Sequence, residues 1–256
     1  MKKNASLLSI LGLAVSASSA QAQGLFSFEP AEPDFYIAAF GGGSFFNDST
    51  FDGISDPVAG VAGPTGTAGV PLNVEVANGS SFNVGGAIGY QLPFRYFFGL
   101  LQPRIEAEVS YGETNVEGGS FNGGNQTFGG GQEAVFLFFN NYSDLRLSED
   151  QRFTPYFGGG LGVALLDSDI GYFPGTATAP TFAVQADTTA FATHGAIGAT
   201  YTLTENIDLY SEGRYFRIYG GDFERNFIGG GDTLFSGSVS DDIQGFTLTG
   251  GLRFRF

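Results

Sequence analysis

The sequence predicts an all-β fold, a closed antiparallel β-barrel that crosses a membrane, and three observations carry this prediction. The segment 246–256 alternates with a period of two, with phenylalanines and leucines on one face and threonines and arginines on the other. Similar alternating segments recur along the chain. After residue 22, every apolar stretch is interrupted well before the ~20 residues that a membrane-spanning helix needs.

The apolar face of 246–256 separates a membrane barrel from a soluble sandwich. A sandwich strand buries its apolar face and presents its polar face to water. Here the apolar face carries aromatic residues as far as Phe256. This pattern is typical of a barrel whose outside meets lipid and whose inside is polar.

The first residues have the features of an export signal. Lys2 and Lys3 precede an apolar run over 7–15, and small residues with Ala20-Gln21-Ala22 follow it. We therefore expect residues 1–22 to be a signal peptide and 23–256 to be the barrel domain. Export together with barrel strands predicts the outer membrane of a bacterial cell.

Composition excludes several classes of function. Loss of Lys2 and Lys3 with the leader would leave nine arginines against 26 acids, a formal charge of −17. So acidic a chain is a poor nucleic-acid binder, because phosphate recognition needs clustered cations. The chain has no cysteine, so it has neither disulfides nor thiolate metal ligands.

We count eight strands, with ten as the alternative. The predicted strands are 34–46, 81–90, 103–111, 133–145, 154–165, 189–202, 206–219 and 242–256. Long polar connections at 47–80, 112–130, 167–188 and 220–241 alternate with short ones at 91–102, 147–152 and 203–205. This segregation predicts long extracellular loops and short periplasmic turns.

The strands must close into a ring, because every backbone N–H and C=O in hydrocarbon needs an internal partner. The interior of an eight-stranded barrel is filled by side chains. Both signs of charge fall on the inferred inner face, so we expect salt bridges across the barrel. The predicted network comprises Arg104, Glu106, Glu108, Asp208, Glu212, Arg214, Arg253 and Arg255. In 135–139 both faces are apolar, which leaves the register of that strand open.

The chain resembles the eight-stranded outer-membrane barrel superfamily that includes OmpA-like membrane domains and opacity-type adhesins. The resemblance is carried by segments 103–111, 154–163, 203–210, 213–216 and 251–256. The resemblance implies that Phe256 belongs to the signal read by the barrel-assembly machinery. Outer-membrane lipid and lipopolysaccharide are the other expected partners, beside an unidentified ligand on a host or neighbouring cell. The chain departs from the family in its long 47–80 segment, in its lack of tryptophan, and in having no peptidoglycan-binding domain after Phe256.

Candidate chemistry is sparse. His194 is the only histidine, and no nucleophile motif or multi-histidine metal site accompanies it, so we expect a polar interior residue. We predict no catalytic, cofactor-binding or metal-binding residues.

We interpret the glycine runs as strand curvature and loop mobility rather than as phosphate-binding loops. The long connections hold thirteen acids and only Arg225 as a cation. We read these acids as a solvated surface, with weak calcium or magnesium binding as the alternative.

The resulting expectation is a non-enzymatic outer-membrane surface protein that contributes to envelope integrity and possesses loops suited to adhesion. The alternative is a narrow porin-like channel for ions or small solutes. A lipid A deacylase, which would use His194, is the enzymatic hypothesis. Fold alone does not decide among these functions.

Overall fold

The computed structural model describes residues 28–54, 56–57, 71–121, 124–148, 150–173, 178–229 and 232–256. The expected signal peptide, 1–22, lies outside these residues. None of the described segments forms a helix of the length and hydropathy needed to cross a membrane.

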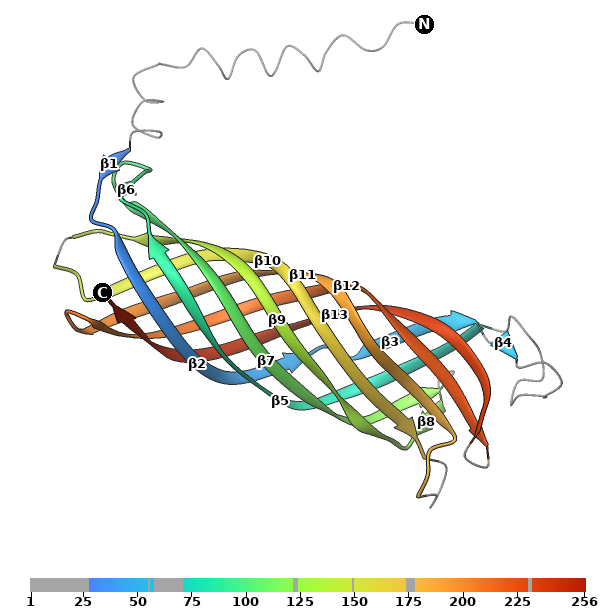
Figure 1. Ribbon diagram of the computed structural model, residues 1–256. Helices are drawn as coiled ribbons and strands as arrows, with labels where there is room; N and C mark the ends of the chain where they lie inside the picture. Colours follow the sequence, from blue (N-terminus) through green and yellow to red (C-terminus); the bar gives the residue numbers. More distant parts are fainter. Residues whose placement is uncertain are drawn as a thin grey trace, which may run out of the picture.

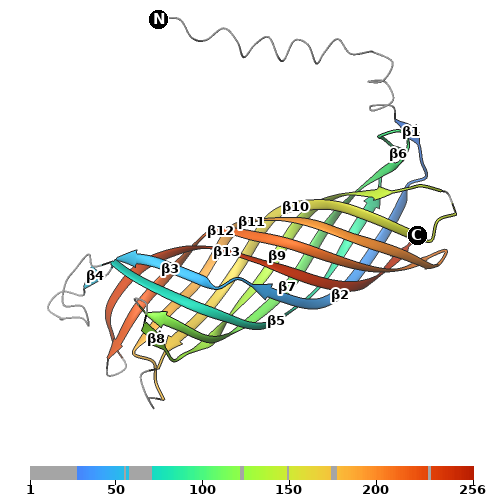
Figure 2. The same ribbon diagram turned by 180° about the vertical axis from the view of Figure 1, so that it is seen from behind.

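Eight long strands form one closed antiparallel ring (Figures 1 and 2). They are β2 (Asp34–Phe46), β5 (Pro71–Gln91), β7 (Leu101–Phe121), β9 (Phe128–Leu145), β10 (Phe153–Tyr172), β11 (Phe182–Thr204), β12 (Ile207–Gly229) and β13 (Asp232–Arg255). Each pairs with its neighbour in sequence, and β13 pairs with β2 to close the ring. The predicted barrel of eight strands is confirmed, and the alternative of ten is wrong.

Five short strands complete the structure. β3 (Ser49–Ile54) continues the wall beyond the end of β2, between β5 and β13. β4 (Asp56–Pro57) pairs with β13, and β8 (Gly124–Gln126) pairs with β7. β1 (Glu29–Pro30) and β6 (Phe94–Arg95) form a separate two-stranded sheet outside the ring.

The strands run much farther than the sequence predicted at one end. Most described residues of the four expected long loops belong to strands, which reach 23 residues in β11 and 24 in β13. A membrane crossing needs only ~9–11 residues per strand. Polar side chains in these stretches were read as loop, but they lie on the outer face of strands that continue past the apolar band. We call this continuation the projecting wall.

The outer face shows where the apolar band ends. On β11 the outward side chains are apolar or small from Tyr201 to Phe191 and polar from Thr189 to Gln185. On β10 the outward side chains change from Leu165 to Asp167 within two residues. The apolar stretches of β10 and β11 are therefore close to the length needed to cross the hydrocarbon layer.

The sidedness of the last strand agrees with the prediction. Leu248, Leu252 and Phe254 are exposed on the outer face, whereas Thr247 and Thr249 are buried inside. The C-terminus lies at the end of the barrel that carries the short turns, the same end at which β1 and β6 stand (Figure 1). The Phe256 side chain is exposed, and its backbone N–H donates to the Phe35 carbonyl at 2.9 Å.

Candidate functional site

The predicted charges lie inside the half of the barrel nearest the short turns, which we call the charged half. Six of them are buried, while Arg214 and Arg255 are half-buried. Period-two alternation along β7 places Arg104, Glu106 and Glu108 on one inner face. The structure brings seven of the eight predicted residues into ion pairs and leaves Arg253 outside them.

Arg104 is the most deeply buried cation, with 1% of its surface exposed. Its Nε lies 3.0 Å from Asp144 Oδ1 and its Nη1 lies 3.1 Å from Glu106 Oε2. The guanidinium also stacks on the rings of Tyr142 and Tyr156, at 4.1 and 4.5 Å from the ring centres. Two carboxylates and two aromatic faces therefore compensate its loss of hydration.

Asp144 is a partner that the sequence analysis missed. It lies near the end of β9 and follows Asn140 and Tyr142 on the inner face. The alternation of these three side chains would have placed Asp144 inside, but the apolar segment 135–139 had left the register of this strand open.

Arg214 ties opposite walls of the barrel together. It donates to both carboxylate oxygens of Glu108, at 2.7 and 2.8 Å, and to Glu212 Oε1 at 2.8 Å. β7 and β12 are four places apart in the ring of eight, so this two-pronged bond spans the interior. Bonds of this geometry are the strong form of the arginine–carboxylate pair.

Two further arginines lie at the mouth near the short turns. Arg255 pairs with Asp208 at 3.1 Å and with Asp34 at 3.4 Å. Arg253 forms no ion pair with any described residue and instead lies over the rings of Tyr36 and Tyr210, at 4.5 and 5.3 Å. The expected salt bridge of Arg253 is thus replaced by contacts with aromatic faces.

His194 lies at the inner end of the charged half. Its Nε2 is 2.8 Å from Asn140 Oδ1, and Asn140 Nδ2 donates to Glu106 and Glu108 at 3.2 and 2.9 Å. Since the amide nitrogen is used by the carboxylates, its oxygen accepts from the imidazole. No described serine or threonine hydroxyl bonds to the ring, and Nδ1 has no partner. The arrangement links the histidine to the ion network and provides no activated nucleophile.

The other half of the interior is mostly apolar, with a few buried polar side chains such as Thr114, Gln132 and Ser168, and we call it the apolar half. The alternation of the strands had predicted a polar lumen throughout. Phe136 and Phe138 of β9 point inward and stack at 5.6 Å, and Phe216 of β12 meets Phe136 at 5.9 Å. This core continues through Leu166, Ile170 and Val184 into the projecting wall. The doubly apolar segment 135–139 was the available signal: one face meets lipid and the other meets this core.

Little space remains inside the described barrel. The cavity at the junction of the two halves, beside Phe136 and Phe216, has a volume of about 20 Å³. The cavities among the charged residues measure about 20 and 10 Å³. Each is about the size of a single water molecule. Side chains therefore fill both halves.

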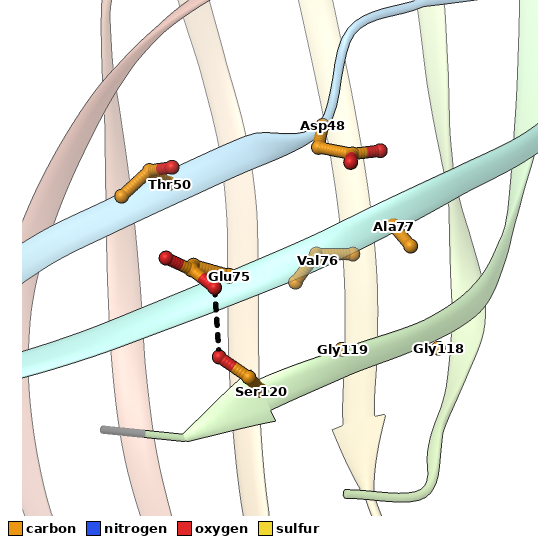
Figure 3. A pocket seen from close by; sticks show the side chains of 8 residues that line it. All are labelled: Asp48, Thr50, Glu75, Val76, Ala77, Gly118, Gly119 and Ser120. Atoms are coloured by element: carbon orange, nitrogen blue, oxygen red, sulfur yellow. Dashed lines mark hydrogen bonds between the residues drawn. The ribbon is translucent and has the colours of Figure 1, made fainter. Parts of the chain in front are cut away.

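The projecting wall carries two large depressions on its surface. One, of about 610 Å³, lies across β3, β5 and β7 and is shown in Figure 3. Asp48, Thr50 and Glu75 line it, and Ser120 Oγ donates to Glu75 Oε2 at 2.9 Å. The other, of about 730 Å³, lies across β10, β11 and β12 and is lined by Asp167, Asp169, Asp187 and Glu224 among others. Both present mainly carboxylates and hydroxyls to the outside.

A row of four carboxylates, the acidic row, crosses the projecting wall and reaches the second depression, which two of its members line. Strand register places Glu113 opposite Glu133, Glu133 opposite Asp167, and Asp167 opposite Asp187. These four residues come from four adjacent strands. All except Glu133 were predicted as loop residues, and the structure holds them on the sheet instead.

Five of the thirteen acids expected in loops have side chains that the structure does not describe. They are Asp52, Asp56, Asp222, Asp232 and Asp241. Among described residues no group of three acids or histidines is arranged to hold a metal ion.

A ring of eight strands with lipid-facing apolar side chains and an ion-paired interior defines an outer-membrane β-barrel. Residues 129–256 match the sequence family described as Surface antigen, and this match covers half of the chain. The chain belongs to that family and lies in the bacterial outer membrane. With this assignment the short-turn end is periplasmic and the projecting wall is extracellular.

Solved structures with a similar course of the chain include outer membrane protein OprG from Pseudomonas aeruginosa, at 15% identity and a TM-score of 0.48, with 89% of this chain and 97% of that chain covered. The outer membrane protease OmpT from Escherichia coli aligns at 13% identity and a TM-score of 0.44, with 90% of this chain and 98% of that chain covered. Neisserial surface protein A aligns at 13% identity and a TM-score of 0.39, with 87% of this chain and 97% of that chain covered. These TM-scores are below 0.5, and the fold assignment stands on the strand pairings alone. No curated protein sequence matches the chain.

Proposed function

We propose that this protein is a non-conducting, non-enzymatic barrel that contributes to the integrity of the outer membrane and presents a rigid wall at the cell surface. The observation that carries the proposal is the filled interior. Charged and aromatic side chains occupy the periplasmic half, mostly apolar side chains occupy the other half, and the three cavities described among them measure about 20 Å³ or less.

Two features argue against the alternatives. Solute passage needs a continuous polar path, and the apolar half interrupts any such path above Arg214 and His194. A hydrolytic role for His194 would need a nucleophile beside the ring, but its ring nitrogen bonds to an amide that is itself held by Glu106 and Glu108.

The partners follow from the surface. Outer-membrane lipid and lipopolysaccharide surround the apolar band, and the barrel-assembly machinery inserts the chain, with Phe256 as part of its signal. The projecting wall contacts host or neighbouring cells through its strands and through the acidic row. A partner on this wall would carry positive charge or bring cations with it.

Conductance tests the sealed interior. The wild-type protein, reconstituted into planar bilayers, should give no steady current. The triple variant Phe136→Ala/Phe216→Ala/Arg214→Ala removes side chains at the junction and should show conductance, whereas Leu248→Ala on the lipid face should remain silent. Steady single-channel steps from the wild-type protein would refute the proposal and favour the narrow pore.

A deletion strain tests the two cellular roles separately. Loss of the protein should raise detergent sensitivity, and the wild-type chain should restore resistance. A chain with Glu113→Gln, Glu133→Gln, Asp167→Asn and Asp187→Asn keeps the barrel and should restore detergent resistance but alter adhesion to charged surfaces. A deletion strain with unchanged detergent sensitivity would contradict the envelope role.

A further inference from the structure

A strained aromatic turn joins β6 to β7 at the periplasmic end. Phe97, Phe98 and Gly99 are consecutive and have φ angles of 52°, 58° and 74°. This left-handed region suits glycine and asparagine, whereas a bulky side chain rarely adopts it. Among the described residues, these two phenylalanines are the only non-glycine residues with positive φ.

The surrounding chain holds this turn in place. Tyr96 and Leu101 form an antiparallel bridge below it, and the Leu100 N–H donates to the Phe97 carbonyl at 3.2 Å. The Leu100 carbonyl accepts from the Arg146 N–H at 2.7 Å, which fixes the turn to the neighbouring β9–β10 connection. A side chain at Gly99 would collide with the Glu29 carboxylate of β1. Strain of this kind persists where neighbouring contacts impose it, and it is concentrated at functional sites.

The two strained rings gain little from the protein itself. The side chains of Phe97 and Phe98 are 42% and 55% exposed, and their rings meet mainly each other, at 5.4 Å. Phe28, directly before β1, is 66% exposed and packs edge-on against Phe94 of β6 at 5.1 Å. We call Phe28, Phe97 and Phe98 the aromatic foot. The protein buries the apolar surface of the foot only in part, which leaves the backbone strain incompletely compensated.

The foot continues the lipid-facing rim of the barrel. Phe256, Phe35 and Tyr90 are exposed on neighbouring strands β13, β2 and β5, with Phe35 and Phe256 6.3 Å apart and Phe35 opposite Tyr90 in the sheet. The β1–β6 sheet stands at this end of the barrel, beside the start of β2 (Figures 1 and 2). Aromatic side chains are favoured at membrane–water boundaries, where one side meets acyl chains and the other meets water.

We propose that the aromatic foot inserts into the periplasmic leaflet of the outer membrane and is a phospholipid-binding element outside the barrel wall. The turn forces both rings outward in the left-handed conformation, and the lipid leaflet supplies the burial that the protein does not. Glu29 and Arg95, which pair in the β1–β6 sheet, keep the base of the foot in the polar headgroup region.

The chain contains no tryptophan, so Phe98→Trp creates a single fluorescent reporter in the foot. In phospholipid vesicles with brominated acyl chains, its emission should be blue-shifted and quenched by bromines near the headgroup more than by deep ones. Leu137→Trp in the apolar band should be quenched by deep bromines, and Asn115→Trp on the projecting wall should be unquenched. Water-like emission from Phe98→Trp, or a blue shift without bromine quenching, would overturn the proposal.

A second variant separates lipid binding from a purely structural role. Phe97→Asn/Phe98→Asn keeps residues that tolerate the left-handed backbone and removes both rings. Because asparagine relieves the backbone strain, the variant should be at least as stable as the wild type if the rings make no contact with lipid. In phospholipid vesicles its folding equilibrium constant should fall on the order of tenfold, because two half-exposed rings lose contact with lipid. An unchanged or increased equilibrium constant in the vesicles would refute lipid binding.

Discussion

Side chains fill both halves of the barrel interior, but one half is packed with charged groups and the other with apolar groups. In the charged half, Arg104 and Arg214 are surrounded by carboxylates and tyrosines. In the apolar half, Phe136, Phe216 and Leu166 form an ordinary hydrophobic core. Outside, the charged half and the beginning of the apolar half face lipid, so the membrane dictates their outer face and leaves the inner face free.

The inner and outer faces of the strands change polarity at different levels along the barrel. The inner face becomes apolar at Phe138 and Ala192, before the outer face becomes polar at Asp167 and Asp187. Beyond that level the strands are polar outside and apolar inside, as in a soluble barrel. The same strands are therefore apolar outside and polar inside within the membrane, and polar outside and apolar inside beyond it. The projecting wall has a hydrophobic core of its own.

The largest effect is expected in the charged half. Arg104→Met leaves Glu106 and Asp144 buried without their cation, and breaking one side of a buried ion pair costs about 3–5 kcal/mol. Denaturant unfolding in detergent micelles measures this loss. Arg217→Met is the matched control, since Arg217 and its partner Asp242 are nearly half exposed, and it should cost much less than Arg104→Met. Equal losses for the two variants would contradict the description of Arg104 as a buried, network-held cation.

In the apolar half, neighbouring leucines of β10 give a matched pair. Leu166→Ala opens a cavity inside the core and should reduce stability by about 2–5 kcal/mol. Leu165→Ala removes the same atoms from the outer face, where lipid or detergent fills the space, so its cost lacks the cavity contribution. The same unfolding assay compares the two. A larger loss for Leu165→Ala would mean that the inner and outer faces of β10 are exchanged.

The smallest effect is expected on the projecting wall. Glu133 lies between Glu113 and Asp167, and like charges directly opposite each other in a sheet are unfavourable. Glu133→Gln should therefore raise stability by about 0.2–1 kcal/mol. The gain should shrink as salt is added, because salt screens exposed charges. Glu224→Gln, whose neighbour on β11 is Gln185, should change stability less. A loss of stability in Glu133→Gln would show that a bound cation, rather than repulsion, governs the row.

The sequence by itself determined the class of fold. Period-two alternation in 246–256 and in 103–111 identified which side chains share a face, and the requirement for internal hydrogen bonds in lipid made closure necessary. The same alternation placed Arg104, Glu106 and Glu108 together on one inner face. These conclusions hold without tertiary information because they depend only on neighbours along a strand.

The tertiary structure decided everything that depends on which strands meet. Glu108 and Arg214 are 106 residues apart and pair because β7 and β12 stand opposite each other in the ring. The inward direction of Phe136 and Phe138 is set by the register of β9 against β10, since a doubly apolar strand carries no sidedness of its own. The length of the projecting wall and the conformation of the Phe97–Phe98 turn likewise come from contacts with distant segments. Local pattern fixes the faces of a strand, whereas its partners, ends and turns are fixed by packing across the closed barrel.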